Sequence, residues 1–136
     1  MSSEETEKPQ INDVNTQIET LKKSIESDPD NPEKLANLGV LYSSINRYEE
    51  ALNLFRSILE KDPKNVEAHK YLGVIYAQIG KLDEAISELE IAVKLKADSP
   101  SLWNNLSEAY RRSKNFHQAN VARMRAIQLS EIPKKV

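Results

Sequence analysis

Apolar residues recur along this chain at spacings of three and four, with polar and charged residues between them. Leu35, Leu38 and Leu41 share one face of a predicted helix, and Ala51 and Phe55 share a face of the next. This periodicity is typical of amphipathic helices that bury one side. The pattern therefore predicts an all-α fold.

The same order of residues returns every 34 positions along the chain. Residues 38–42 read Leu-Gly-Val-Leu-Tyr, residues 72–76 read Leu-Gly-Val-Ile-Tyr, and residues 106–110 read Leu-Ser-Glu-Ala-Tyr. Two further landmarks, which begin at Tyr48 and Ile58, recur at the same period. The chain is thus predicted to hold three copies of one helix-turn-helix unit.

This unit resembles the tetratricopeptide repeat, whose pattern is Trp-x2-Leu-Gly-x2-Tyr, then Ala-x3-Phe, then Pro. The third copy opens the pattern with Trp103, and the first copy supplies Ala51, Phe55 and Pro63. The resemblance implies a right-handed α-α superhelix, a solenoid of three helix pairs preceded by an N-terminal capping helix. The chain departs from the family pattern at Leu35 and His69 (for Trp), Leu89 and Arg123 (for Phe), and Ala97 and Glu131 (for Pro).

Small residues mark the expected close contacts between helices. Glycine in a helix costs roughly 0.5–1 kcal/mol relative to alanine, so Gly39 and Gly73 indicate a neighbouring helix too close for a larger side chain. Ser107 holds the same position in the third copy. We expect the opposing contacts to come from the alanines at 51, 85 and 119.

The repeats divide the chain into one domain and two tails. We expect a disordered acidic tail at residues 1–10, a single repeat domain at 11–131 and a C-terminal tail at 132–136. Within the domain the predicted parts are a capping helix at 12–28, repeat 1 at 32–65, repeat 2 at 66–99 and repeat 3 at 100–131.

The two ends of the array show different capping patterns. Ile18 belongs to the apolar face of the capping helix, which lacks a preceding partner helix. In the last helix Asn120 and Arg123 replace apolar residues of the earlier repeats, while Met124 and Ile127 are expected to be partly exposed. Terminal repeats need such polar outer faces for solubility.

Composition narrows the classes of partner. The net charge of -2 and the pI near 5.8 provide no basic surface for nucleic acid. The chain has no cysteine, no run of about 18 apolar residues and no apolar leader at its N-terminus. We therefore expect a cytoplasmic protein that neither inserts into membranes nor binds nucleic acid.

Catalytic and metal-binding patterns are also lacking in the sequence. His69 and His117 occupy unrelated positions of different repeats, and three glycines form no phosphate-binding loop. We expect no cofactor, no bound metal and no enzymatic activity. Glu49 and Glu90 are assigned to outward faces of second helices.

The resemblance places a binding surface on the concave side of the solenoid, which the first helix of each repeat lines. It implies a protein or peptide partner held in this groove, either as an extended peptide or as a helix. The predicted groove residues are Asn37, Val40, Lys70, Tyr71, Val74, Gln78, Asn104, Asn105, Glu108 and Arg112.

Asn37, Tyr71 and Asn105 hold equivalent positions and are expected to form a row along the groove. An amide both donates and accepts hydrogen bonds, so it can pair with a peptide backbone whatever its side chains. The row resembles the asparagine ladder of O-linked N-acetylglucosamine transferases, with Tyr71 interrupting it. Asparagine is also simply common at this position in the family's average repeat, and both interpretations stay open.

A comparison with the co-chaperones that bind heat-shock chaperone tails is negative. Their repeats grip a carboxylate with Lys, Asn, Asn, Lys and Arg. The matching positions here are Ala36, Val40, Tyr71, Ser101 and Asn105. The charged grip is missing, so a heat-shock chaperone tail is not the expected partner.

Two functions remain from the sequence. The first is an adaptor or scaffold that binds one partner in the groove. The alternative is a structural protein that self-assembles end to end through the last helix, where Met124 and Ile127 lie. We expect a monomer, with self-association as the competing hypothesis.

Overall fold

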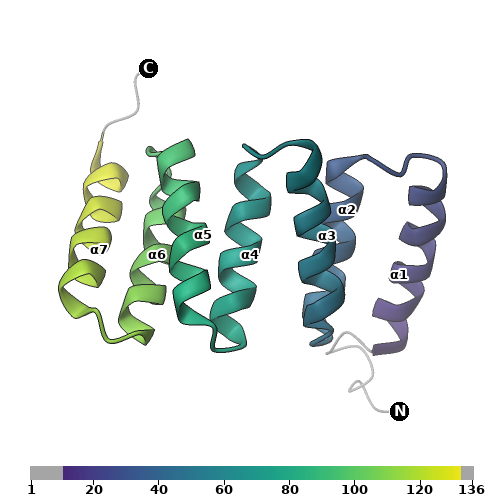
Figure 1. The fold of residues 1–136 in the computed structure, drawn as a ribbon, viewed down its shortest axis with the longest axis horizontal. Coiled ribbons are helices and arrows are strands. Elements are labelled where there is room, and N and C mark those ends of the chain that lie inside the picture. Colours follow the sequence, from purple (N-terminus) through teal and green to yellow (C-terminus); the bar gives the residue numbers. More distant parts are fainter. Residues whose placement is uncertain (1–10, 133–136) are drawn as a thin grey trace, which may run out of the picture. The chain divides into compact units, whose positions relative to one another are not determined.

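The computed structural model describes residues 11–132, and within this range the chain forms seven helices and no strand (Figure 1). The predicted all-α class is confirmed. The helices are α1 (Ile11–Glu26), α2 (Pro32–Ser44), α3 (Tyr48–Lys61), α4 (Val66–Gln78), α5 (Leu82–Leu95), α6 (Pro100–Arg112) and α7 (Phe116–Glu131).

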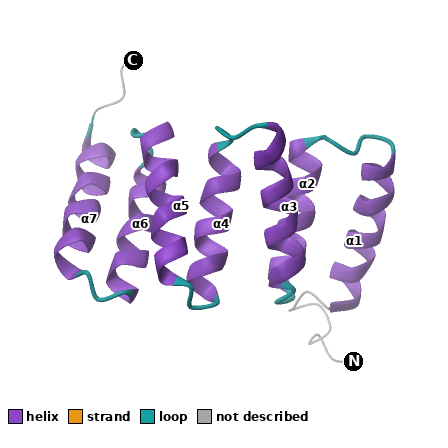
Figure 2. Cartoon of the chain, in the orientation of Figure 1, coloured by secondary structure: helices purple, strands orange, loops and turns teal. Residues whose placement is uncertain are grey.

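The helices fall into two compact units, one ending at Lys61 and the next beginning at Asp62. In the first unit α2 packs on both α1 and α3. In the second unit α4 packs on α5, α5 on α6 and α6 on α7, and α4 also reaches α6. Short loops join successive helices, as Figure 2 shows.

The first helix of each repeat begins at a side-chain cap. The Asn31 side chain accepts a hydrogen bond from the Lys34 amide at 3.1 Å, and the Asn65 side chain accepts one from the Ala68 amide at 2.9 Å. Ser99 caps α6 in the same way. These caps satisfy amides that lack a partner inside the helix, so the 34-residue period extends to the helix starts.

The turns inside the three repeats share one backbone conformation. Asn46, Gly80 and Lys114 all have positive φ, at 63°, 84° and 67°. They lie 34 residues apart and each follows the first helix of its repeat. Glycine adopts this conformation without strain, asparagine tolerates it, and lysine does not favour it.

The predicted close contacts at the small residues are present, but the closest neighbours differ from the expected alanines. A Cβ atom on Gly39 would lie 2.7 Å from the Phe55 ring, and one on Gly73 would lie 2.5 Å from Leu89. The Ala85 carbonyl oxygen is next, 3.2 Å from the added atom on Gly73. The glycines thus make room mainly for Phe55 and Leu89, each of which lies one turn after the alanine of its repeat.

In the third repeat a hydrogen bond marks the same close approach. The Ser107 hydroxyl donates to the Ala119 carbonyl oxygen at 2.8 Å, which joins α6 to α7. Ala119 is buried, as the equivalent Ala51 and Ala85 are. Serine therefore replaces glycine here because its side chain is small and finds an acceptor on the facing helix.

The side chains of His69 and Glu88 meet between α4 and α5. The buried His69 side chain places Nδ1 2.7 Å from the Glu88 carboxylate on α5 and Nε2 2.8 Å from the Pro63 carbonyl oxygen. His69 therefore holds α4 to α5 and to the preceding loop. His117 is exposed on α7.

The outward assignment of Glu90 is wrong. The Tyr110 hydroxyl on α6 donates a hydrogen bond to the Glu90 carboxylate on α5, and Glu90 is half-buried. Burial and the nearby carboxylate raise the pKa of Tyr110 to about 12. Glu90 does not face solvent alone because α6 packs over α5 and brings Tyr110 to it. Glu49 is exposed, as expected.

No helix among the described residues is long and apolar enough to cross a membrane. The predicted N-terminal tail and residues 133–136 of the predicted C-terminal tail lie outside the described range. The proposed boundaries of the domain and of its parts stay predictions.

Candidate functional site

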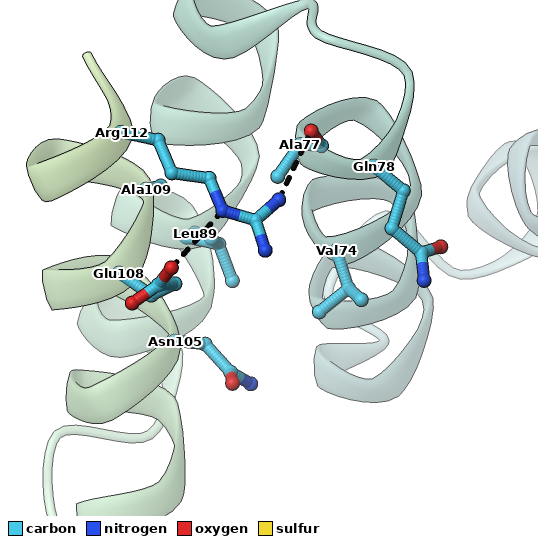
Figure 3. A pocket seen from close by; sticks show the side chains of 8 residues that line it. All are labelled: Val74, Ala77, Gln78, Leu89, Asn105, Glu108, Ala109 and Arg112. Carbon is cyan, nitrogen blue, oxygen red and sulfur yellow. Dashed lines mark hydrogen bonds and ion pairs between the residues drawn. The ribbon is translucent and has the colours of Figure 1, made fainter.

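A cavity of about 210 Å³ lies between α4 and α6 in the second unit (Figure 3). Its base is apolar, with Leu89 of α5 beneath it, while amide and charged side chains surround its mouth. The lining residues are Val74, Ala77, Gln78, Leu89, Asn105, Glu108, Ala109 and Arg112.

The cavity is bounded by equivalent positions of two repeats. Val74 and Gln78 lie on one face of α4, and Glu108 and Arg112 hold the same positions 34 residues later on α6. Side chains at spacings of three and four share a helix face. Because α4 and α6 are both first helices, each presents this face at the cavity.

Ala109 is a small residue in the lining of the cavity. This position holds Leu41 in the first repeat and Ile75 in the second. Alanine lacks the outer carbons of those side chains, so the third repeat is less filled at this point. The buried Ala109 methyl group and the buried Leu89 side chain form the apolar base of the cavity. Water gains no hydrogen bonds from this surface, so covering it with an apolar group is favourable.

Charged groups close one end of the cavity. The Arg112 guanidinium donates to the Glu108 carboxylate at 3.0 Å and to the Ala77 carbonyl oxygen at 3.2 Å, as the dashed lines in Figure 3 show. The second bond joins α6 to the last turn of α4, where a cation complements the helix dipole. Arg112 thus ties the two walls together.

Arg111 adds a second cation at this end. Its Nε donates to the Glu108 carboxylate at 3.1 Å. The Arg111 hydrogen bond, followed by the one from Arg112, holds the pKa of Glu108 below its usual range. Glu108 is therefore an anion at neutral pH and serves as an acceptor at the rim.

The structure brings together five of the predicted groove residues: Val74, Gln78, Asn105, Glu108 and Arg112 all line the cavity. Tyr71 lies one turn before Val74 on α4, and the Lys70 ammonium sits 4.4 Å from the centre of its ring. Lys70 also pairs with Glu67 at 2.8 Å.

The remaining predicted groove residues lie elsewhere. Asn104 is exposed on α6, next to the cavity residue Asn105. Asn37 and the exposed Val40 belong to α2, in the first unit. The row of Asn37, Tyr71 and Asn105 stays a prediction.

Sequence reasoning missed the apolar part of this site. The sequence marks Leu89 only as the residue at the Phe position of the family pattern, and Ala77 and Ala109 are not among the predicted groove residues. One sequence signal was available, because the third copy replaces two large aliphatic residues by Ala109 at a position that is otherwise apolar and large. A small side chain at a position that is large in the other repeats predicts a local cavity between the helices.

The site does not offer the ligands of a metal centre. Over the described part of the chain, no three His, Cys, Asp or Glu residues gather in a metal-binding group. The cavity is also smaller than the roughly 300–1,000 Å³ typical of small-molecule sites. Its size and lining suit one side chain of a partner protein.

Comparison with known proteins agrees with the repeat pattern. Two family models, both described as Tetratricopeptide repeat, match residues 46–110 and 20–53. Together they span more than half of the chain. No curated protein matches the sequence.

Solved structures of MamA share the fold. MamA MSR-1 has 28% sequence identity to this chain and a TM-score of 0.74, over 87% of this chain and 68% of its own. A second MamA structure has 25% identity and a TM-score of 0.78, over 87% of this chain and 69% of its own. These values support a common helical repeat architecture.

Proposed function

Since this chain belongs to the tetratricopeptide repeat family, we propose that it is an adaptor that holds a partner protein at the α4–α6 cavity. The family supports a protein-interaction role in general. The finer proposal is that one apolar side chain of the partner enters the cavity. The amides of Gln78 and Asn105 then bind the partner's backbone at the mouth.

One observation carries this proposal: an apolar base lies directly beneath hydrogen-bonding side chains. Val74, Leu89 and Ala109 gain from burial against an apolar group. Gln78 and Asn105 each offer donors and an acceptor, which suits a peptide backbone in either an extended or a helical partner. Such a buried anchor with a polar surround is the usual form of an interaction hot spot.

The same proposal includes three predictions from the sequence. The protein has no enzymatic activity, binds no nucleic acid and works in the cytoplasm. Each rests on the residue composition and on the lack of a catalytic pattern in the sequence, as described above.

The test fills the cavity with the residue that the second repeat carries. Immobilised wild-type protein and its Ala109→Ile variant are used to capture partners, and a captured protein is then titrated by calorimetry. We expect Ala109→Ile to weaken its binding about tenfold or more, because the anchor side chain loses its space. A thermal melt of the variant checks that it folds.

A second variant separates shape from hydrogen bonding. Replacing Gln78 and Asn105 together by alanine is expected to weaken the same partner without changing the cavity base. Glu49→Lys, on the exposed face of α3, is the control and should bind normally. A partner that binds both cavity variants normally but loses affinity for Glu49→Lys would contradict the proposal.

Self-assembly is the alternative that the sequence left open. It is motivated by exposed apolar residues of α7, among them Met124 and Ile127. Light scattering over a range of concentrations distinguishes the two, because end-to-end assembly follows mass action. A constant monomer mass supports the adaptor.

A further inference from the structure

The outward face of α7 combines apolar side chains with two exposed arginines. Phe116, Val121, Met124 and Ile127 are exposed by 59%, 56%, 50% and 38%. On the opposite face Ala119, Ala122 and Ala126 are buried against the rest of the second unit. Large apolar side chains thus share the solvent side of α7 with the polar residues His117, Asn120 and Gln128.

The preceding repeat indicates what covers such a face. Glu90 and Val93 of α5 lie 34 residues before Met124 and Ile127. There Glu90 contacts Tyr110 of α6, and Val93 is 5% exposed. The equivalent face of α5 is therefore occupied by a helix. Because the two helices hold the same place in their repeats, Met124 and Ile127 lie at positions that a helix covers one repeat earlier, while Arg123 replaces the buried Leu89.

Two arginines border this face. Arg123 precedes Ile127 by four residues, and Arg125 follows Val121 by four, so each lies beside one edge of the apolar strip. Both are exposed, and neither forms an ion pair within the described part of the chain. Arg47, Arg111 and Arg112 differ, since each pairs with a glutamate.

The charge of α7 is also unlike that of the whole protein. The chain has a net charge of -2, yet α7 carries two arginines against a single carboxylate, Glu131, in its last turn. Charges at the edge of an interface select a partner of opposite sign. A helix with carboxylates beside an apolar stripe complements this face.

A second copy of the chain complements it poorly. The surface of α1 is polar along Asn15, Thr16, Glu19, Thr20 and Lys23. Face-to-face pairing of two α7 helices would bring arginines of like charge together, which is unfavourable.

We propose that the outward face of α7 is a second docking site, which binds an acidic amphipathic helix of a partner protein. This site is separate from the α4–α6 cavity and does not depend on it. It would make the protein an adaptor with two interaction surfaces.

The probe is a labelled synthetic peptide of about 18 residues, long enough to form a helix. It carries leucine at spacings of three and four and glutamate at the flanking positions, and a matched peptide has lysine in place of glutamate. Fluorescence anisotropy measures both. We expect the acidic peptide to bind at least about tenfold more tightly, and to weaken as salt rises from about 0.05 M to about 0.5 M.

Variants assign the binding to α7. Replacing Val121 and Met124 together by serine, or Arg123 and Arg125 together by glutamate, should each reduce binding of the acidic peptide about tenfold or more. The matched control replaces Ile91 and Leu95 by serine, since these are exposed apolar residues of α5. That control and Ala109→Ile should bind the acidic peptide as wild type does.

Several results would overturn the proposal. They are failure of the acidic peptide to bind, equal binding of the acidic and basic peptides, and α7 variants that bind like wild type. A dimer that the Val121 and Met124 variant abolishes would show a second copy to be the occupant. Binding to vesicles of anionic lipid, lost in the same variant while the peptide does not bind, would assign the face to a membrane.

Discussion

At the scale of the residue, the three repeats place different residues at the same positive-φ position of the turn. The chain turns after each first helix through a residue at positive φ, and that residue is Asn46, Gly80 or Lys114. An added Cβ at Gly80 would meet no atom within 4 Å, so glycine is there for its backbone freedom rather than for space. Lys114 has no such freedom, and the third repeat holds strain at this point.

Lys114→Gly is therefore expected to stabilise the protein. Relief of the left-handed strain is worth about 1–2 kcal/mol, less the extra entropy that glycine has in the unfolded chain. Urea unfolding followed by circular dichroism should show a midpoint above that of wild type. Gly80→Ala is the converse and should lower the midpoint, and equal midpoints for all three proteins would contradict this account.

At the scale of the element, the contact between α5 and α6 includes one titratable pair. Tyr110 donates to Glu90, and its pKa lies at about 12 in the folded protein. A phenol in the unfolded chain has a pKa near 10. The folded value is higher, so this contact contributes its stability below pH 10, and the contribution is lost as the pH rises through 12.

Tyr110→Phe should remove that dependence. We expect wild type to lose stability between about pH 10 and pH 12 more steeply than the variant does. Urea midpoints measured across this interval test the difference. Tyr48→Phe is the control, since the Tyr48 hydroxyl bonds to Asn46 in the adjoining turn. A steep loss that persists in Tyr110→Phe would show that other groups cause it.

The α1 helix provides a second prediction at this scale. Ile18 is buried at 3% exposure, while the neighbouring Gln17 is exposed, and α1 packs on α2. Deleting residues 1–27 should expose the apolar side of α2 to solvent. We expect the melting temperature to fall by several degrees, or the protein to aggregate. Deleting residues 1–10 alone should leave the melt unchanged. Equal behaviour of the two truncations would mean that α1 is not a cap.

At the scale of the whole molecule, the two proposed surfaces should act independently. The cavity lies between α4 and α6, whereas the docking face lies on the side of α7 turned away from its buried alanines. Loss at one surface should leave affinity at the other unchanged, because distant sites without shared partners behave additively. Calorimetry of the cavity partner, with and without saturating acidic peptide, tests this. A change of more than about threefold in affinity would reveal coupling.

The repeat period and helix pattern were readable from the sequence because they depend on local spacing. A 34-residue recurrence, the glycines at 39 and 73, and the proline after Asp62 specify where helices run and where they must approach each other. The exposed Asn120 and Arg123 at the last helix were likewise predictable, since each replaces an apolar residue of the earlier copies.

Other features needed the tertiary structure because they depend on which atoms meet across helices. The inward contact of Glu90 with Tyr110 joins residues 20 positions apart, and no local pattern distinguishes it from a solvated glutamate. Arg112 likewise reaches the Ala77 carbonyl oxygen only because α4 lies beside α6. The cavity reflects the small side chain of Ala109, and it exists only because neighbouring helices enclose the space. Spacing along the chain determines the faces of helices, and packing between helices decides what those faces enclose.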